Sequence, residues 1–174
     1  DGSEPVDFLP FVEDDLKQAN ASHEGSSLEV GRLLSIIQRL HAQVGLENIR
    51  LTGGEPLLYP ALASLIRGIR AAGIPAIRLT TNGFLLERQA VVLKDAGLEA
   101  VNVSLDAVGE AIFFQMTRRH SAARIMQGID AAIAAGLDVK INAVIMKGIN
   151  DSQVLPLLDF AFSRGLRIRF LEVM

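Results

Sequence analysis

Cysteine is absent from this sequence of 174 residues. The chain therefore forms no disulfide, presents no thiolate nucleophile and supplies no cysteine ligand to zinc or to an iron–sulfur cluster. The three histidines, His23, His41 and His120, are scattered along the chain. We predict no metal site among the residues of this chain.

Long apolar runs, a basic excess and the common nucleotide-binding motifs are missing as well. No apolar stretch approaches the ~18 residues of a membrane helix, and the polar, acidic amino-terminal segment does not have the pattern of a signal peptide. The net charge is −3, whereas nucleic-acid-binding proteins usually carry a basic patch and a high pI. The absence of GxGxxG and of a Walker lysine motif disfavours a standard nucleotide fold. We predict a cytoplasmic protein that binds neither membranes nor nucleic acids.

The apolar residues that are present suffice for one domain. They make up 49% of the chain, and its length suits a single domain, residues 1–174, with its own core. Residues 1–27 have no strong hydrophobic period and are predicted to be irregular. Apolar residues then recur with helical spacing, which predicts a helix over residues 27–43. Residues 28–174 are predicted to be a series of βα repeats.

Each repeat has the same form: a helix ends in small residues and a glycine, and a short β-branched strand follows. Glycine at that place adopts the left-handed conformation that terminates a helix. Strands that alternate with helices are typical of βα units in a parallel sheet. The predicted strands cover residues 48–52, 76–80, 100–104, 138–145 and 167–171.

Polar residues collect at the carboxyl ends of the predicted strands, and this pattern favours a barrel over an open sheet. Barrel enzymes build their sites at that end from several strands, whereas an open doubly wound sheet binds ligands at one switch point. Five strands are too few to close an eight-stranded barrel. We therefore predict an α/β fold, a partial (β/α) TIM-type barrel with parallel strands and about five βα units. The polar strand-end residues are Thr52, Gly53, Gly54, Glu55, Thr80, Thr81, Asn82, Ser104, Asp106, Asn142 and Glu172.

The segment Gly53-Gly54-Glu55-Pro56 is predicted to be a binding loop between a strand and a helix. Paired glycines let the backbone approach a ligand, because no Cβ stands in the way. Proline suits the first turn of a helix, and the carboxylate of Glu55 can accept hydrogen bonds from an amine. The alternative interpretation is a tight turn without a ligand.

Several motifs occur in order along the chain, and together they resemble those of one enzyme family. They are Gly53-Gly54-Glu55-Pro56, Thr80-Thr81-Asn82-Gly83, Asn102-Val-Ser-Leu-Asp106 and Lys147-Gly-Ile-Asn-Asp151. With these motifs, residues 48–174 resemble the radical S-adenosylmethionine (radical SAM) enzymes almost without a gap. The sequence of these residues is most similar to the GTP 3′,8-cyclase family of molybdenum cofactor biosynthesis.

The resemblance implies a site for S-adenosylmethionine. The loop of Gly53, Gly54 and Glu55 would hold the methionine amino end of this cofactor. Ser104 would contact the same molecule, and Met174 would pack against its adenine. From the residues alone, Ser104 could instead cap the turn after its strand, and Met174 could be a core residue.

The resemblance also implies a GTP site, with Arg50, Thr80 and Lys140 on the GTP side and Arg169 as a weaker candidate. Arginine binds phosphate oxygens bidentately, and lysine adds a point charge, so cations inside strands suit this ligand. The alternative for Arg50 and Lys140 is a salt bridge to one of the carboxylates of Glu55, Asp106 and Glu172.

In the family, S-adenosylmethionine is cleaved reductively at a [4Fe–4S] cluster that a CxxxCxxC loop holds, and the resulting radical takes a hydrogen from the ribose of GTP. The resemblance thus implies a lyase that converts GTP to 3′,8-cyclo-7,8-dihydro-GTP, with the cluster in the full-length parent. Because this chain has no cysteine, we expect a fragment that is inactive as given, and we assign it no catalytic residue.

Two other functions remain open from the sequence. One is a radical SAM enzyme that acts on a peptide or another small molecule, and the other is a cysteine-free, non-catalytic binding or scaffold relative. A partial barrel also has two edge strands, predicted at residues 48–52 and 167–171. Unpaired edges favour self-association, so we predict a possible homodimer.

Overall fold

The computed structural model describes residues 29–119 and 121–172, in which strands and helices alternate. The strands are β1 (Asn48–Leu51), β2 (Ala76–Thr81), β3 (Ala100–Ser104), β4 (Asp138–Ile145) and β5 (Arg167–Glu172). The helices are α2 (Val30–Val44), α3 (Leu62–Ala71), α4 (Leu86–Asp95), α5 (Glu110–Thr117), α6 (Ala122–Ala134) and α7 (Val154–Phe162), with the single 3-10 turns η1 (Pro56–Leu58) and η2 (Asp151–Gln153).

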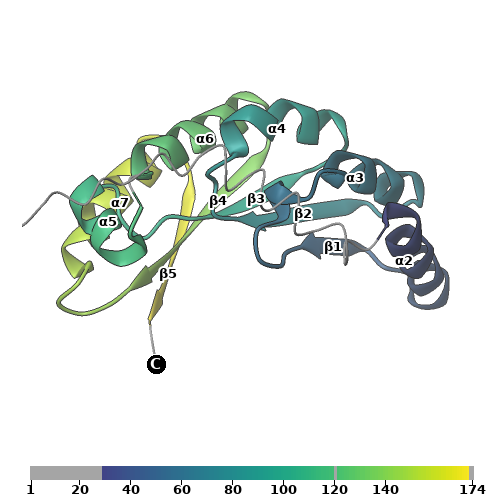
Figure 1. Cartoon of the computed structure of the whole chain (residues 1–174), viewed down its shortest axis with the longest axis horizontal. Helices are drawn as coiled ribbons and strands as arrows, with labels where there is room; N and C mark the ends of the chain where they lie inside the picture. Colours follow the sequence, from purple (N-terminus) through teal and green to yellow (C-terminus); the bar gives the residue numbers. More distant parts are fainter. Residues whose placement is uncertain (1–28, 120, 173–174) are drawn as a thin grey trace, which may run out of the picture.

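The five strands form one parallel sheet in the order of the sequence, β1-β2-β3-β4-β5. Crossovers between parallel strands are right-handed, so an order that never reverses keeps every crossover helix on the same side of the sheet. Figure 1 shows the helices along the outer side of a curved sheet. A doubly wound sheet would reverse its order and carry helices on both faces. The prediction of a partial barrel is therefore confirmed.

Alternate strand residues supply the core, because successive side chains of a strand point to opposite faces of the sheet. On the helix side, Leu79, Val103 and Ile141 are fully buried. Apolar residues at helical spacing face them, among them Ile66 and Ile69 of α3, which are also fully buried. The core thus lies between the sheet and its single layer of helices.

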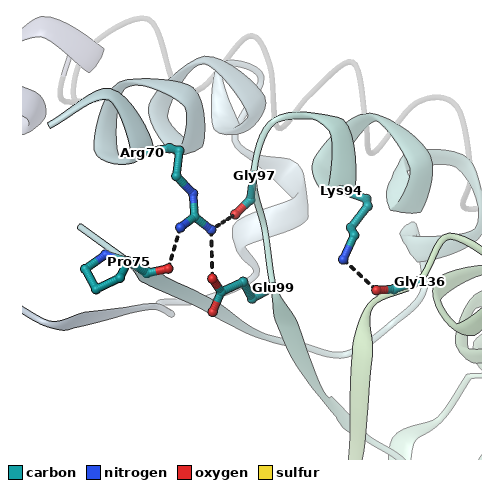
Figure 2. A network of polar contacts seen from close by, with 6 residues as sticks. All are labelled: Arg70, Pro75, Lys94, Gly97, Glu99 and Gly136. Carbon is teal, nitrogen blue, oxygen red and sulfur yellow. Dashed lines mark hydrogen bonds and ion pairs between the residues drawn. The ribbon is translucent and has the colours of Figure 1, made fainter. Parts of the chain in front are cut away.

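At the amino-terminal end of the strands, cationic side chains join neighbouring repeats (Figure 2). Arg70, near the end of α3, donates through Nη2 to the carbonyl of Gly97 at 2.6 Å, and Lys94 of α4 donates through Nζ to the carbonyl of Gly136 at 2.6 Å. Gly97 and Gly136 have φ angles of 107° and 78°. These angles confirm the predicted left-handed glycine at the helix ends. The same glycines present the carbonyls that bind the preceding repeat.

The opposite face of the sheet, which we call the open face, is polar and cationic. Within the described residues no helix packs on this face, which lies on the inner side of the curved sheet (Figure 1). Its side chains alternate with the buried ones along each strand. Its polar side chains are Asn48, Arg50, Arg78, Thr80, Asn102, Ser104, Asp138, Lys140, Asn142, Arg167 and Arg169.

Strands β1 and β5 are the two edges of the sheet, as expected. Self-association through these edges stays a prediction. No helix in residues 29–119 and 121–172 combines the length and the apolar character needed to cross a membrane.

Candidate functional site

The strand register arranges the open face in rows. The four candidate substrate residues Arg50, Thr80, Lys140 and Arg169 all lie on this face. Each row runs across neighbouring strands and joins residues that are partners in the register. From the amino to the carboxyl end of the strands, the rows contain Arg50–Arg78, Thr80–Asn102–Lys140–Arg167 and Ser104–Asn142–Arg169. Residues far apart in the sequence are thus neighbours, because adjacent strands lie about 4.8 Å apart.

The open face is strongly positive, although the chain as a whole is acidic. Among the strand residues on this face are five cationic side chains and one carboxylate, Asp138, a formal charge of +4 in a chain of net charge −3. Asp138 is already paired, because Arg167 Nη2 lies 2.5 Å from its Oδ2. Arg50, Arg78, Lys140 and Arg169 make no hydrogen bond or ion pair with any other described residue. The described residues therefore leave a positive charge on this face without a carboxylate partner.

This arrangement bears on the salt-bridge alternative for Arg50 and Lys140, and their role towards a substrate stays a prediction. The alternative was a salt bridge to the carboxylate of Glu55, Asp106 or Glu172, and none is present in the described part of the chain. Partial burial and the neighbouring cations Arg169, Arg167 and Arg50 lower the pKa of Lys140 below the usual lysine value. Cations brought this close to one another without carboxylates are suited to an anionic ligand.

The Gly53–Gly54 segment follows β1 at the carboxyl end of the sheet. Gly53 has a φ of 150°, which favours glycine, and both glycines are exposed. A methyl group placed on either one would meet no atom within 4 Å. Within the described residues, the backbone of this loop is therefore uncovered, and the binding of a ligand there stays a prediction.

Glu55 connects this loop to the end of β2. Its Oε1 accepts hydrogen bonds from Thr81 Oγ1 at 2.6 Å and from the backbone N of Leu57 at 3.0 Å, and its Oε2 accepts one from the backbone N of Asn82 at 2.8 Å. Both carboxylate oxygens therefore already have partners. These three bonds give Glu55 a part in positioning the glycine loop, and its contact with a ligand stays a prediction.

Ser104 ends β3 and is exposed on the open face. Its side chain makes no hydrogen bond within the described residues, so the capping alternative is not observed there. Beside it in the register, Asn142 has a buried Oδ1 atom without a hydrogen-bond partner. Met174, predicted to pack against adenine, lies outside the described residues.

A buried asparagine that sequence reasoning missed orders the loops after β3 and β4. Asn150 is fully buried; its Nδ2 donates to the carbonyls of Asp106 and Val144, both at 2.8 Å, and its Oδ1 accepts from the backbone N of Met146 at 2.8 Å. Asp106 Oδ1 also accepts from the Val144 N at 2.7 Å, and burial raises the pKa of Asp106 although this bond lowers it in part. Residues 147–151 were recognised in the sequence as a motif of the family, but the motif did not predict the hydrogen-bond partners of Asn150.

The residues of this structure fit S-adenosylmethionine, but they do not fit an iron–sulfur cluster. Gly53 and Gly54 leave open space beside their backbone, and Ser104 provides a hydroxyl without a hydrogen bond to any described residue. The chain has no cysteine, and the described residues contain no group of three or more His, Cys, Asp or Glu side chains placed to hold a metal ion. No chemical step is therefore derived through a cluster.

Comparison with known proteins identifies related sequences. A family model of the Radical SAM superfamily matches residues 13–161. The GTP 3′,8-cyclase of Staphylococcus epidermidis is 42% identical over 143 residues, which cover 81% of this chain and 42% of that protein. The GTP 3′,8-cyclase of Staphylococcus saprophyticus is 44% identical over 140 residues, 79% of this chain and 41% of the relative. The chain thus spans about two fifths of the length of these relatives.

Solved structures share the fold at lower sequence identity. SuiB of Streptococcus suis bound to S-adenosylmethionine matches with a TM-score of 0.73 and 20% identity, over 86% of this chain and 34% of that one. Methylornithine synthase (PylB) matches with a TM-score of 0.68 and 15% identity, over 86% of this chain and 45% of that one. At these identities the likeness concerns the fold alone.

Proposed function

The chain belongs to the radical SAM superfamily, and on that basis we propose that it is the barrel part of a cytoplasmic GTP 3′,8-cyclase. This lyase of molybdenum cofactor biosynthesis converts GTP to 3′,8-cyclo-7,8-dihydro-GTP. The observation that carries the proposal is the open face, where cations without a partner among the described residues share the sheet with the glycine loop after β1. The identity of 42–44% to enzymes named GTP 3′,8-cyclase supports the choice of substrate.

In this proposal the glycine loop and the end of β3 bind S-adenosylmethionine. The backbone of Gly53 and Gly54 would hydrogen-bond its amino-acid end, and the hydroxyl of Ser104 would contact the same molecule. Glu55 would keep the loop in place through its bonds to Thr81 and Asn82. When bound, S-adenosylmethionine supplies the radical chemistry of the family, with the protein providing binding and orientation.

GTP would bind across the open face. Arg50 and Lys140 would hold phosphate oxygens, because guanidinium and ammonium groups form charge-assisted hydrogen bonds with them. Thr80, in the same row as Lys140, would add a hydroxyl, and Arg169 would extend the cationic surface towards Ser104. A bound triphosphate would also relieve the repulsion that lowers the pKa of Lys140.

Calorimetric titration of the 174-residue chain with GTP and with S-adenosylmethionine tests the proposal. Arg50→Gln and Lys140→Gln should each weaken GTP binding about tenfold, the effect of losing one charge-assisted hydrogen bond. Arg39→Gln, on the exposed surface of α2, is the matched control and should leave the affinity unchanged. Gly54→Val should fill the space beside the loop and weaken S-adenosylmethionine but not GTP.

Each ligand tests a separate part of the proposal. If S-adenosylmethionine binds but GTP does not bind more tightly than ATP, the radical SAM assignment stands and GTP is the wrong substrate. If Arg39→Gln weakens GTP as much as Lys140→Gln does, the open face is not the substrate site.

A further inference from the structure

One cation of the open face, Arg78, has no role in the proposed function. Arg78 of β2 lies directly beside Arg50 of β1 in the register, and both side chains are exposed. Backbones of neighbouring strands are about 4.8 Å apart, so the two guanidinium stems leave the sheet side by side. Arg78 was not among the candidate substrate residues predicted from the sequence.

Among residues 29–119 and 121–172, no carboxylate pairs with either arginine. The adjacent open-face positions of β1, β2 and β3 are Asn48, Ala76, Thr80 and Ala100, all without charge. Asp138 follows Ala100 in the same row, two strand spacings from Arg78, and it is bound to Arg167 at 2.5 Å. Arg50 and Arg78 themselves have no hydrogen bond or ion pair within residues 29–119 and 121–172.

Other arginines of this protein show what a structural role looks like. Arg70 binds two backbone carbonyls and Glu99, Arg164 binds both carboxylate oxygens of Asp130, and Arg167 binds Asp138. Like charges directly opposite one another on a sheet are destabilising. Within the described residues, Arg78 thus has a like charge opposite it and no polar or ionic partner, a pattern that suits a residue placed for a ligand.

We infer that Arg78 and Arg50 together form an anion site that binds a phosphate group of the substrate through two guanidinium forks. The fork of arginine matches the oxygens of phosphate bidentately, and two forks on neighbouring strands surround one phosphate with up to four donors. The pair lies one row nearer the amino end of the strands than Lys140. A chain of phosphates would therefore extend from the Lys140 row towards the Arg50–Arg78 row. This inference rests on the proposed function for the identity of the substrate, but not for the existence of the anion site.

Inorganic tripolyphosphate, GTP and guanosine are the probes that separate these two parts. Calorimetric titrations would compare the wild-type chain with Arg78→Gln, Arg78→Lys and the control Arg67→Gln. Arg67 is an exposed arginine of α3 on the helix layer, also without a partner within the described residues. Arg78→Gln should weaken tripolyphosphate and GTP about tenfold, and Arg78→Lys should weaken them less, because lysine keeps the charge but loses the fork. Guanosine binding should not change.

A thermal melt without ligand separates this role from a structural one. Relief of the Arg50–Arg78 repulsion should leave the Tm of Arg78→Gln equal to or above that of the wild type. The phosphate probes should then raise the Tm of the wild type more than that of the variant. A lower Tm of Arg78→Gln without ligand would identify Arg78 as a structural residue and overturn the inference.

The remaining outcomes distinguish the two proposals. If Lys140→Gln weakens GTP while Arg78→Gln behaves like Arg67→Gln, the anion site is overturned and the proposed function stands. If tripolyphosphate binding depends on Arg78 but GTP binds no more tightly than tripolyphosphate, the anion site stands and the nucleotide assignment fails. Absence of binding of both phosphate probes to the wild-type chain would overturn the inference.

Discussion

The same polar residue types occur on the two faces of the sheet, but they differ in how many hydrogen bonds their side chains make. On the helix side and in the loops that complete it, Asn150 makes three hydrogen bonds and Thr81 two. On the open face, the side chains of Asn142 and Thr80 make none within the described residues. The difference separates polar groups that hold the fold together from polar groups that are available to a ligand.

The arginines repeat this contrast. Arg70 donates to the carbonyls of Pro75 and Gly97 and pairs with Glu99 across the amino-terminal ends of the repeats (Figure 2). Arg50 and Arg78 have no such partners in the part of the chain that the structure describes. A protein stable by only a few kcal/mol does not gain from unpaired like charges in a row. Substitutions of matched residues on the two faces therefore test which groups serve the fold.

The asparagines should show the largest difference. Asn150→Ala would leave the carbonyls of Asp106 and Val144 and the backbone N of Met146 without their buried partners. Such losses cost about 1–3 kcal/mol for each buried group, so we expect the free energy of unfolding to fall by about 3 kcal/mol or more. Urea denaturation measures this change. Asn142→Ala removes an amide oxygen that has no partner and should cost under about 1 kcal/mol; an equal loss in both variants would contradict the contrast.

The threonines of β2 should show an intermediate difference. Thr81→Val removes the hydroxyl that donates to Glu55 at 2.6 Å and accepts from the backbone N of Gly83 at 3.0 Å, at nearly constant volume. We expect a loss of about 2 kcal/mol, because a buried hydrogen-bonded pair is broken next to a carboxylate. Thr80→Val, one residue away on the open face, should change the free energy of unfolding by under about 0.5 kcal/mol. Guanidinium denaturation of both variants measures the two losses. A larger loss in Thr80→Val than in Thr81→Val would show that the hydroxyl that stabilises the fold lies on the open face, against this prediction.

The arginines should differ by less, because their side chains are partly exposed. Arg70→Gln should lower the free energy of unfolding by about 1 kcal/mol, since water screens the ion pair and replaces part of the hydrogen bonding. Arg50→Gln should not lower it. Thermal melts at low and high salt provide the measurement, and salt should stabilise the wild type more than Arg50→Gln, because it screens the repulsion on the open face. A destabilised Arg50→Gln would mean that this arginine has a structural partner.

The smallest effect concerns the pH dependence that Lys140 contributes. Because its pKa in the folded chain is lowered, the folded state disfavours the charged lysine, and this penalty is fully present at neutral pH. As the pH rises through the lowered pKa towards the ordinary value of 10.5, the folded chain releases this proton first, so stability relative to Lys140→Gln should rise. Parallel urea denaturations of the two proteins from pH 7 upwards measure the difference. A difference that falls with pH would show that Lys140 has an anionic partner.

The local pattern of apolar residues and glycines was sufficient to predict the βα repeat. The predicted strands agree with β1 to β5 to within one residue at their carboxyl ends, because alternation and the glycine helix ends are properties of short segments. The helix predicted over residues 27–43 is α2, Val30–Val44, and residues 27 and 28 lie outside the described part. The ordered motifs were also sufficient to indicate the family, which the match over residues 13–161 confirms.

The partners of individual side chains could not be predicted in the same way. Glu55 was expected to accept hydrogen bonds from an amine of the ligand, and its two oxygens bind Thr81, Asn82 and Leu57 in the structure. Thr81 is 26 residues away in the sequence, and Asn150 lies 44 residues from Asp106. Contacts at such separations depend on which strands become neighbours, and no local period carries that information.

The sequence by itself thus determined the βα repeat, the glycine loop, the alternation of buried and polar residues along each strand, and the family. Tertiary structure decided which of the two alternating faces the helices cover, because that choice follows from the handedness of the crossovers and from the strand order. It also decided which cations have partners. Arg70, at the end of a helix, reaches the carbonyl of the next glycine turn, whereas Arg50, Arg78 and Lys140 lie together on the face without helices. Their common position there, and not their charge alone, makes them candidates for phosphate binding.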